Sequence, residues 1–396
     1  MNWNPRFAQR TALMRRSTIR ELLKLAAQPG IISFAAGLPP AELFPAEEFR
    51  TAADAVLRRR PERALQYGET AGEAELRDWI AGTHSLPDRP LRRENVLITT
   101  GSQQGLDLIG RVFLDSGDRV WVENPTYLAA LTAWRPYGAE FTPLAMDEGG
   151  LLLTELDRPD APSAKLLYSV PNFQNPTGVT LETGRRRQLV AWSRATGIPL
   201  VEDNPYGELR YEGEALPPLL DLDREGPEGD GEAGQVIHLG TFSKTLAPGL
   251  RVGWVIAPSP VIDKLTLAKQ SMDLHTSTLC QHIALELARD GVLERHLPRL
   301  RAVCGARRDA MLQALTEHMP AGGTWSRPAG GMFLFLRLPE QVNATALLTQ
   351  ALARGVAFVP GEDFHANGGG HNTLRLNFTG SSAEQIGEGV RRLAAT

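Results

Sequence analysis

The sequence predicts an α/β fold with a mostly parallel central sheet, helices on both of its faces, and a smaller α+β domain beside it. Short apolar runs alternate with segments of helical periodicity through the middle of the chain. Polar turns follow four of these runs closely, and the last hundred or so residues show a different order of elements. A chain of 396 residues is also long enough for roughly two to three domains.

Each strand of the expected sheet is a short apolar run that ends at glycine, proline or a polar residue. Helix-like segments with one apolar face lie between them, at residues 102–113, 127–134 and 184–195. Strands that are apolar on both faces and separated by helices are typical of a parallel sheet covered on both sides. The expected strands are residues 95–100, 119–122, 165–170, 198–202, 236–239 and 252–256.

The smaller domain is expected from the last third of the chain. We expect residues 45–290 to form the large domain, and residues 1–44 together with 291–396 to form the small domain. An N-terminal helix around residues 17–27 is expected to pack with the small domain. The acidic, glycine-rich residues 221–234 are expected to be an exposed loop. The small-domain elements are a helix at 293–315 with Pro298 near its first turn, a strand at 331–338, a helix at 344–353, a strand at 373–378 and a helix at 382–393.

The charge balance excludes several classes of partner. Lys plus Arg number 42 and Asp plus Glu number 46, which gives a formal net charge of −4. A protein that binds nucleic acid or an anionic membrane usually carries an excess of basic residues, and this chain has none. Two arginine runs, residues 58–60 and 185–187, lie in helix-like segments, and we expect them to be solvated helix faces.

Cysteine usage and hydropathy narrow the classes further. The two cysteines, Cys280 and Cys304, belong to no CxxC pair, so neither a disulfide framework nor a bound metal is expected. The first 20 residues are polar and basic, and no run approaches 18 continuous apolar residues. The expected location is therefore the cytoplasm.

Lys244 lies in a polar loop after the strand predicted at 236–239. Its amine could act as a nucleophile if burial and nearby positive charge lowered its pKa. Arg251 and the hydroxyl groups of Thr241 and Ser243 could hold a phosphate beside it, with the arginine donating two hydrogen bonds. From this segment alone, an ordinary surface lysine is an equally good interpretation.

The stretch from Gly101 to Gln104 opens a helix directly after a strand. Free backbone N–H groups and the helix dipole favour an anion at such a position, and Ser102 adds a hydroxyl group. Ser102 as a simple N-cap residue is the alternative interpretation.

Two further polar stretches follow the strands predicted at 165–170 and 198–202. Asp203 could pair with a protonated ring nitrogen, and Tyr206 could donate to an oxygen of the same ring, although an Asx turn before Pro205 explains the aspartate equally well. Asn175 precedes a Pro-Thr-Gly turn, where its amide could bind that ring oxygen. Because ligands of such sheets bind outside the carboxyl ends of the strands, these stretches together indicate one site.

At these positions the chain resembles the class I and II aminotransferases of fold type I, which use pyridoxal phosphate (PLP). The order and spacing of the matching residues agree with that family over nearly the whole chain. Thr241 departs from the pattern, because serine is usual there, but the change keeps the hydroxyl group. The matching residues are Asn175-Pro176-Thr177-Gly178, Asp203-Asn204-Pro205-Tyr206, Ser243-Lys244, Arg251 and Arg375.

The resemblance implies a role for each residue. Lys244 would hold PLP as a Schiff base and move a proton at the substrate α-carbon, and Asp203 would pair with the pyridine nitrogen. Arg375 would bind the substrate α-carboxylate, although the alternation of its strand leaves a solvent-facing arginine open. The remaining implied contacts are Asn175 and Tyr206 at the ring oxygen, Tyr127 stacked on the ring, Ser102, Gln103, Thr241, Ser243 and Arg251 at the phosphate, and Tyr67 at the phosphate of a second subunit.

Three more segments are similar to the 2-aminoadipate aminotransferases of microbial lysine biosynthesis: residues 17–24 (STIRELLK), 32–39 (ISFAAGLP) and 361–372. In that group a mobile N-terminal helix covers the substrate, and its serine and arginine bind the distal carboxylate. The corresponding residues are Ser17 and Arg20, and Gly37 would lie against the substrate backbone. For Arg20, a salt bridge to an acidic neighbour is the alternative.

The resemblance therefore implies a homodimeric enzyme that moves an amino group between an L-amino acid and 2-oxoglutarate. The implied donor is 2-aminoadipate, with leucine or aromatic amino acids as further donors. Kynurenine, aromatic and branched-chain aminotransferases carry similar motifs, and PLP-dependent lyases and PLP-sensing regulators use the same fold, so these functions stay open. About 30 residues precede the ISFAAG stretch, fewer than the winged-helix domain of such a regulator requires.

Overall fold

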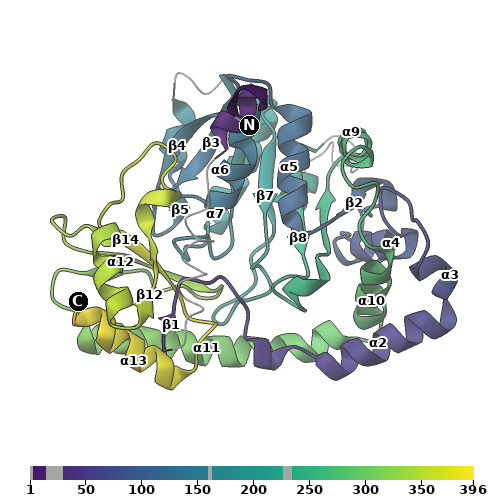
Figure 1. Ribbon diagram of the computed structural model, residues 1–396. Helices are drawn as coiled ribbons and strands as arrows, with labels where there is room; N and C mark the ends of the chain where they lie inside the picture. Colours follow the sequence, from purple (N-terminus) through teal and green to yellow (C-terminus); the bar gives the residue numbers. More distant parts are fainter. Residues whose placement is uncertain (1–2, 15–29, 159–162, 226–233) are drawn as a thin grey trace.

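A twisted eight-stranded sheet forms the centre of the molecule, as the computed structural model shows for residues 3–14, 30–158, 163–225 and 234–396 (Figure 1). Its strand order is β2-β9-β8-β7-β6-β3-β4-β5. The pairs from β8 through β4 are parallel, β9 is antiparallel to both of its neighbours, and β5 is antiparallel to β4. The strands are β2 Val96–Thr99, β3 Arg119–Asn124, β4 Glu140–Asp147, β5 Gly150–Leu151, β6 Ala164–Ser169, β7 Leu200–Asp203, β8 Val236–Thr241 and β9 Gly253–Ile256.

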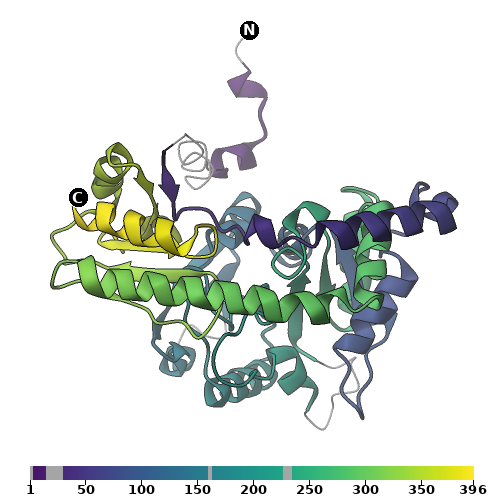
Figure 2. The same cartoon turned by 90° about the horizontal axis from the view of Figure 1, so that it is seen from below.

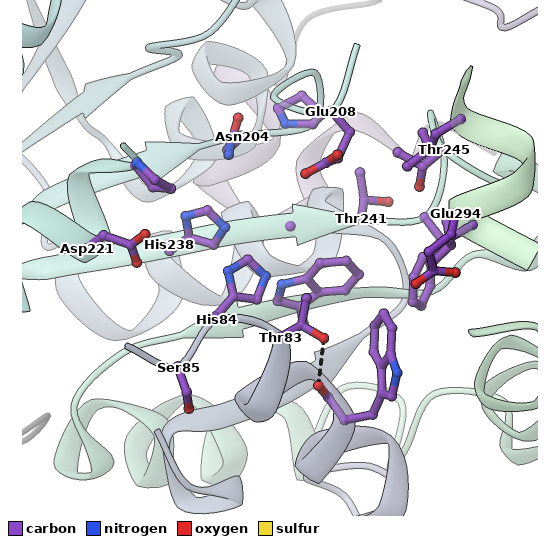
Figure 3. A pocket seen from close by; sticks show the side chains of 18 residues that line it. Thr83, His84, Ser85, Asn204, Glu208, Asp221, His238, Thr241, Thr245 and Glu294 are labelled. Carbon is purple, nitrogen blue, oxygen red and sulfur yellow. Dashed lines mark hydrogen bonds between the residues drawn. The ribbon is translucent and has the colours of Figure 1, made fainter. Parts of the chain in front are cut away.

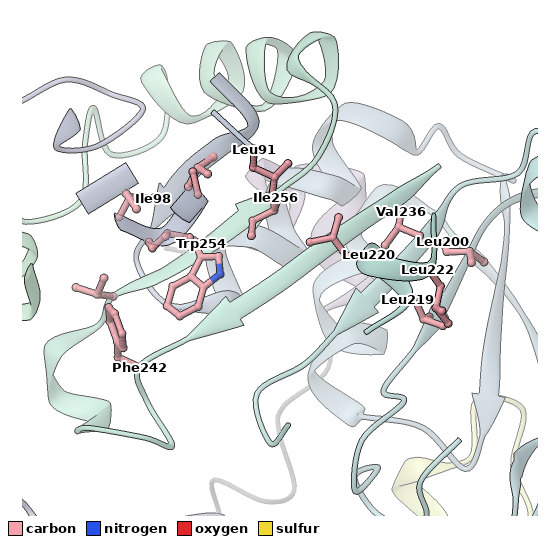
Figure 4. Close-up of a cluster of buried hydrophobic side chains, with 14 of the residues drawn as sticks. Leu91, Ile98, Leu200, Leu219, Leu220, Leu222, Val236, Phe242, Trp254 and Ile256 are labelled. Atoms are coloured by element: carbon pink, nitrogen blue, oxygen red, sulfur yellow. The ribbon is translucent and has the colours of Figure 1, made fainter. Parts of the chain in front are cut away.

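Helices cover both faces of this sheet, which confirms the predicted fold class. Side chains of β3 alternate between the two cores, since Val120 and Val122 pack with α5, α6 and α9, whereas Trp121 packs on the opposite face. Figure 4 shows part of that opposite core, where Leu219 and Leu222 of α8 lie close to Leu200 of β7. The covering helices are α4 Ala74–Thr83, α5 Ser102–Phe113, α6 Leu128–Trp134, α7 Thr183–Thr196, α8 Leu219–Arg224, α9 Ser259–Gln270 and α10 Thr278–Arg289.

A second, smaller sheet lies beside the first, with strand order β10-β11-β14-β13. The long helix α11, Val292–His318, connects the two parts (Figure 2). Leu293 near its start belongs to a core of the large sheet, whereas Leu315 near its end packs in the core of the small sheet. The other elements are α2 Ala46–Arg59, α3 Pro61–Ala64, β1 Ile32–Ser33, β10 Thr324–Trp325, β11 Phe333–Arg337, α12 Ala344–Ala353, β12 Val356–Ala357, β13 Val359–Pro360, β14 Thr373–Asn377 and α13 Ala383–Ala394.

One arginine of the run at 185–187 contradicts the prediction of a solvated helix face. Arg186 is fully buried, and its guanidinium donates to the carbonyl oxygens of Leu181, Pro171 and Pro217 at 2.8–2.9 Å and to Asn172 Oδ1 at 2.6 Å. Buried backbone carbonyls require donors, and this one side chain supplies several. Arg186 thereby ties α7 to the loop that begins at Pro171.

The predicted loop at 221–234 is wrong for its first residues. Helix α8 extends to Arg224, because Leu219, Leu220 and Leu222 bury their side chains against the large sheet. Asp223, also buried, accepts hydrogen bonds from the backbone N–H groups of Gln235 and Val236. Its acidic character therefore reflects an internal hydrogen-bonding role, while residues 226–233 lie outside the described part of the chain.

Helix α11 begins at Val292, one residue before its expected start, and Pro298 lies inside the helix in its second turn instead of near its first. In the described ranges, no helix combines the length and the apolar character that crossing a membrane requires. The same ranges contain no cluster of His, Cys, Asp or Glu side chains arranged to hold a metal ion.

Candidate active site

The carboxyl ends of the parallel strands meet the start of β9 at one edge of the large sheet, where a cavity of about 370 Å³ opens. The small sheet contributes Phe333 and Arg375 to its wall, and the segment that follows β1 contributes Gly37. The lining residues are Gly37, Leu38, Ser102, Gln103, Tyr127, Val170, Asn175, Asp203, Pro205, Tyr206, Thr241, Ser243, Lys244, Pro248, Arg251, Phe333 and Arg375. The structure thus brings together residues that are far apart in the sequence.

Lys244 points into this cavity from the connection between β8 and β9. Its Nζ atom donates a hydrogen bond of 2.7 Å to the carbonyl oxygen of Gly37. Burial, with the nearby charges of Arg375 and Arg251, lowers the pKa of the Lys244 amine to about 8. A partly buried amine with such a pKa is a competent nucleophile, and the interpretation as a surface lysine does not hold.

Asp203 ends β7 and is buried, with 2% of its surface exposed. Tyr168 of β6 donates its hydroxyl to Asp203 Oδ2 at 2.8 Å, whereas Oδ1 has no hydrogen-bond partner among the described residues. Burial raises the pKa of the Asp203 carboxyl to about 6, against the opposing effect of the Tyr168 hydroxyl. A buried acceptor without a partner is costly, so this oxygen is suited to a donor that enters the cavity.

Hydroxyl groups and a guanidinium gather where α5 begins. Thr241 Oγ1 donates to Ser243 Oγ at 2.9 Å and accepts from the Ser243 N–H at 3.1 Å. Gly101 precedes α5 with φ +73°, and a Cβ atom there would collide with the guanidinium of Arg251.

Because Gly101 is the residue before the helix, Ser102 is its first residue and makes no capping bond, so the N-cap interpretation of Ser102 is wrong.

Arg375 is buried in the middle of β14, which contradicts the solvent-facing interpretation. Its guanidinium donates to Asn175 Oδ1 and to the carbonyl oxygen of Ala35, both at 2.8 Å, and lies 4.1 Å from the centre of the Phe333 ring and 5.1 Å from that of Phe364. Burial lowers its pKa to about 10, and its Nε atom has no partner among the described residues. A buried guanidinium that no carboxylate neutralises is suited to an anionic ligand.

Two tyrosines complete the wall around Asp203. Burial raises the pKa of Tyr127 to about 12 and raises that of Tyr206 further, so both hydroxyls keep their protons and can donate hydrogen bonds. Tyr206 stands edge-on to Phe333, with ring centres 6.0 Å apart.

Of the residues expected at the site, one is absent from the cavity wall and two lie outside the described part of the chain. Tyr67 does not line the cavity and is 78% exposed, with its ring edge-on to His275. Ser17 and Arg20 lie outside the described residues, so their expected contacts with a substrate stay predictions.

Sequence reasoning missed Tyr168, Phe333 and Phe364. Tyr168 lies within the apolar run of β6, where an aromatic residue is typical of a core strand, and only its pairing across the sheet reveals the contact with Asp203. Phe333 begins β11, and Phe364 ends the short helical turn that follows β13. Nothing in the sequence shows that both rings pack against Arg375, although an arginine within an alternating apolar strand is a signal for a buried cation.

The side chains present fit pyridoxal phosphate. The unpartnered oxygen of Asp203 could accept a hydrogen bond from a pyridinium N–H group, and Lys244 could bond to the aldehyde carbon. The phosphate would lie at the start of α5, where backbone N–H groups of the helix add hydrogen-bond donors. The side chains that would hold it are Ser102, Gln103, Thr241, Ser243 and Arg251. Asn175 and Tyr206 would contact the ring oxygen.

Comparisons with known proteins agree with this chemistry. Residues 29–393 match the family model described as aminotransferase class I and II. A 2-aminoadipate transaminase of Thermus thermophilus is 46% identical over 99% of this chain and 96% of its own length. Aromatic-amino-acid aminotransferase 1 of Thermococcus litoralis is 44% identical over 100% of this chain and 95% of its own length.

The solved structures give the same result. LysN, an α-aminoadipate aminotransferase from Thermus thermophilus in complex with N-(5′-phosphopyridoxyl)-L-leucine, superposes with a TM-score of 0.92 at 43% identity, covering 100% of this chain and 98% of LysN. Together with the cavity described above, the match over nearly the full length shows that this chain belongs to the class I and II aminotransferases and is an enzyme that uses pyridoxal phosphate.

Proposed function

We propose that this aminotransferase moves an amino group between L-2-aminoadipate and 2-oxoglutarate, as a step of lysine biosynthesis, and that leucine and aromatic amino acids are further donors. The observation that carries the proposal is the placement of Lys244, Asp203 and Arg375 around one cavity in a chain that is 46% identical to a 2-aminoadipate transaminase. The segments at 17–24 and 32–39 add support, because they resemble that subgroup.

In the proposed mechanism Arg375 fixes the substrate. Its guanidinium faces the cavity with no carboxylate paired to it among the described residues, so the substrate α-carboxylate would supply the missing charge through two parallel hydrogen bonds. Asn175 holds the guanidinium in place through its Oδ1 atom. This orients the substrate α-carbon toward Lys244.

Lys244 moves the proton. Its pKa of about 8 leaves a fraction of the amine neutral near neutral pH, which a general base at the α-carbon requires. Bound PLP supplies an electron-withdrawing ring that takes up the electrons of the broken Cα–H bond. Asp203 would keep the ring nitrogen protonated through its free Oδ1 atom, and the Tyr206 hydroxyl would donate to the ring oxygen.

We also propose that the active enzyme is a homodimer in which Tyr67 reaches the phosphate site of the second subunit. Tyr67 is among the most exposed large side chains of the described residues, and it lies outside the cavity of its own chain. A large exposed aromatic residue suits an interface better than solvent.

Donor specificity is tested by steady-state kinetics over 2-aminoadipate, leucine, phenylalanine and kynurenine with 2-oxoglutarate as acceptor. We expect the highest kcat/KM with 2-aminoadipate. Arg20→Ala should lower kcat/KM more for 2-aminoadipate than for leucine, because only the former carries a distal carboxylate. Equal losses for both donors would remove Arg20 from side-chain binding.

The alternative that a specific observation favours is an aromatic-amino-acid aminotransferase, because a relative of that name is 44% identical over the whole chain. A higher kcat/KM for phenylalanine or kynurenine than for 2-aminoadipate would establish it. The spectrum distinguishes amino transfer from lyase chemistry: glutamate alone should remove the long-wavelength absorption of the lysine-bound cofactor, and Lys244→Ala should lack this absorption from the start.

A further inference from the structure

A second cavity of about 530 Å³ lies on the other side of β8 from the active site (Figure 3). Helices α4, α8 and α11 contribute to its wall, whereas α5 contributes to that of the active site. Pro205 and Thr241 line both cavities.

Carboxylates stand at two separate ends of this cavity. Figure 3 shows Asp221 beside His238 at one end, and Glu294 on the opposite side, below Thr245. Asp221 Oδ1 is buried without a hydrogen-bond partner, and burial raises the pKa of this carboxyl. Glu294, in the first turn of α11, pairs with no other described residue through its carboxylate.

The wall between the two ends is aromatic. The rings of Trp79, Phe242 and Trp254 form a chain, with centres 6.2 Å and 4.9 Å apart in that order. Trp254 is only 9% exposed, and its indole Nε1 has no hydrogen-bond partner among the described residues. Unpaired buried polar atoms on both Trp254 and Asp221 indicate that the cavity holds polar contents, such as a ligand with its waters.

The charges of the wall select the sign of a ligand. Among the described residues, no lysine or arginine lines the cavity. Two histidines line the wall. His238 forms a hydrogen bond of 2.9 Å with Glu202. The ring of His84 lies 5.2 Å from that of His238 and 6.2 Å from that of Trp254, and burial lowers the pKa of His84 to about 3, so it carries no positive charge at neutral pH. Glu208 is held by Arg301 at 2.8 Å and is therefore the least available of the three carboxylates. A cation meets two unpaired carboxylates and aromatic faces here, whereas an anion would meet repulsion.

We propose that this cavity is a binding site for a linear aliphatic diamine or polyamine. One ammonium group would bind Asp221 and the other Glu294, while the methylene chain would lie along the rings of Trp79, Phe242 and Trp254. Charge-assisted hydrogen bonds at both ends and apolar contact between them explain why carboxylates and aromatic rings occur in this order. Because Thr241 belongs to both cavities, occupancy would be sensed next to the phosphate side of the active site.

The probes must carry charge without reacting with the cofactor. Tertiary diamines meet this condition, because an amine without N–H cannot condense with an aldehyde. We would titrate the holoenzyme with N,N,N′,N′-tetramethyl diamines of four, six and eight methylene groups by isothermal calorimetry. Dimethylbutylamine, with a single charge, is the matched monoamine.

We expect at least one diamine to bind once per chain, without changing the absorption of the cofactor. Asp221→Asn and Glu294→Gln should each weaken its binding about tenfold, as the loss of a charge-assisted hydrogen bond predicts. Glu140→Gln, which removes an exposed carboxylate far from the cavity, should leave binding unchanged. Should Asp221→Asn fail to fold, Glu294→Gln decides the question alone.

Three results would overturn the proposal: no heat of binding for any diamine, binding that survives both substitutions, or a monoamine that binds as tightly as the diamines. The second of these would place the ligand elsewhere on the protein. The third would show that only one end of the cavity is used.

Discussion

At the scale of single residues, the carboxylate of Asp203 is defined by an asymmetry. One oxygen accepts from Tyr168, and the other has no partner among the described residues. Tyr168 also packs edge-on against Trp134 at 5.3 Å, which limits the rotation of its ring. The tyrosine therefore fixes which oxygen faces the cavity.

Tyr168→Phe should raise the pKa of Asp203, because the Tyr168 hydroxyl is the largest influence that lowers it. A protonated Asp203 pairs poorly with a pyridinium nitrogen, so the pH below which the apoenzyme loses affinity for PLP should move up by about one unit. Titrating PLP into the apoenzyme from pH 5 to pH 8 measures this shift. Tyr137→Phe, which removes a hydroxyl bonded to Asp107 instead, is the matched control and should leave the profile in place.

Asp203 also makes the stability of the apoenzyme depend on pH. Its pKa is about 6 in the folded chain against a reference of 3.8, so the unfolded chain loses this proton first as the pH rises. The contribution of Asp203 to the free energy of unfolding should therefore fall between pH 4 and pH 6, by up to about 3 kcal/mol.

Asp203→Asn removes this dependence. In urea unfolding of the two apoenzymes, the variant should gain stability relative to the parent between pH 4 and pH 7. A stability difference that stays constant over this range would contradict the assigned environment of Asp203.

At the scale of elements, Arg186 links helix α7 to the active-site loop. Its guanidinium bonds Pro171 and Asn172, which begin the turn that carries Asn175. The helix was predictable from its periodicity. Its buried arginine was not, because the acceptors come from separate segments at 171–172, 181 and 217.

Arg186→Ala should lower the free energy of unfolding by about 3 kcal/mol, since it leaves buried carbonyl groups without donors. Arg187→Ala is the control from the same run. Its side chain is 57% exposed and pairs with Glu225 at the surface, so its loss should cost less than about 1 kcal/mol. Urea denaturation of both variants measures the difference, and equal effects would contradict a structural role for Arg186.

Helices and strands were predicted correctly where the hydrophobic pattern alone determines the element. Helix α12 has its predicted bounds, and the strands β6 and β8 lie within two residues of theirs, because apolar runs between turns define them. The segment at 221–224 was assigned wrongly because its charges outweighed three leucines that pack inward. Among site residues, those at the ends of strands or directly after them were predictable from their position, and Arg375 through the family resemblance. Tyr168, inside a strand, required the register of β6 on β7.

At the scale of the whole molecule, the active site combines two sheets. Arg375 comes from the small sheet, and Lys244 and Asp203 come from the large one. Helix α11 packs in the cores of both, so the two parts share one continuous element. The proposed dimer would add a further contribution, from Tyr67 of the second subunit.

Mixing two impaired variants tests whether the second subunit contributes Tyr67 to the active site. Lys244→Ala and Tyr67→Ala homodimers should each be impaired at both of their sites. In a hybrid dimer, one site would carry both substitutions and the other would carry neither. Refolding the two variants together should therefore restore up to roughly a quarter of the parent activity, since about half of the dimers are hybrids with one intact site each. No restored activity above that of the separate variants would show that Tyr67 acts within its own chain or not at all.

The antiparallel direction of β9 has a consequence for how the protein folds. Strands β8 and β9 pair across the loop that carries Ser243, Lys244 and Arg251, so this contact is local in sequence, unlike the pairing of β2 with β9. Closing a short loop costs less conformational entropy than a long crossover, and local contacts form faster. Pulsed hydrogen exchange should therefore find the amides of β8 and β9 protected before those of β2. Lys244 would then be held in the β8–β9 hairpin before β2 completes this edge of the sheet.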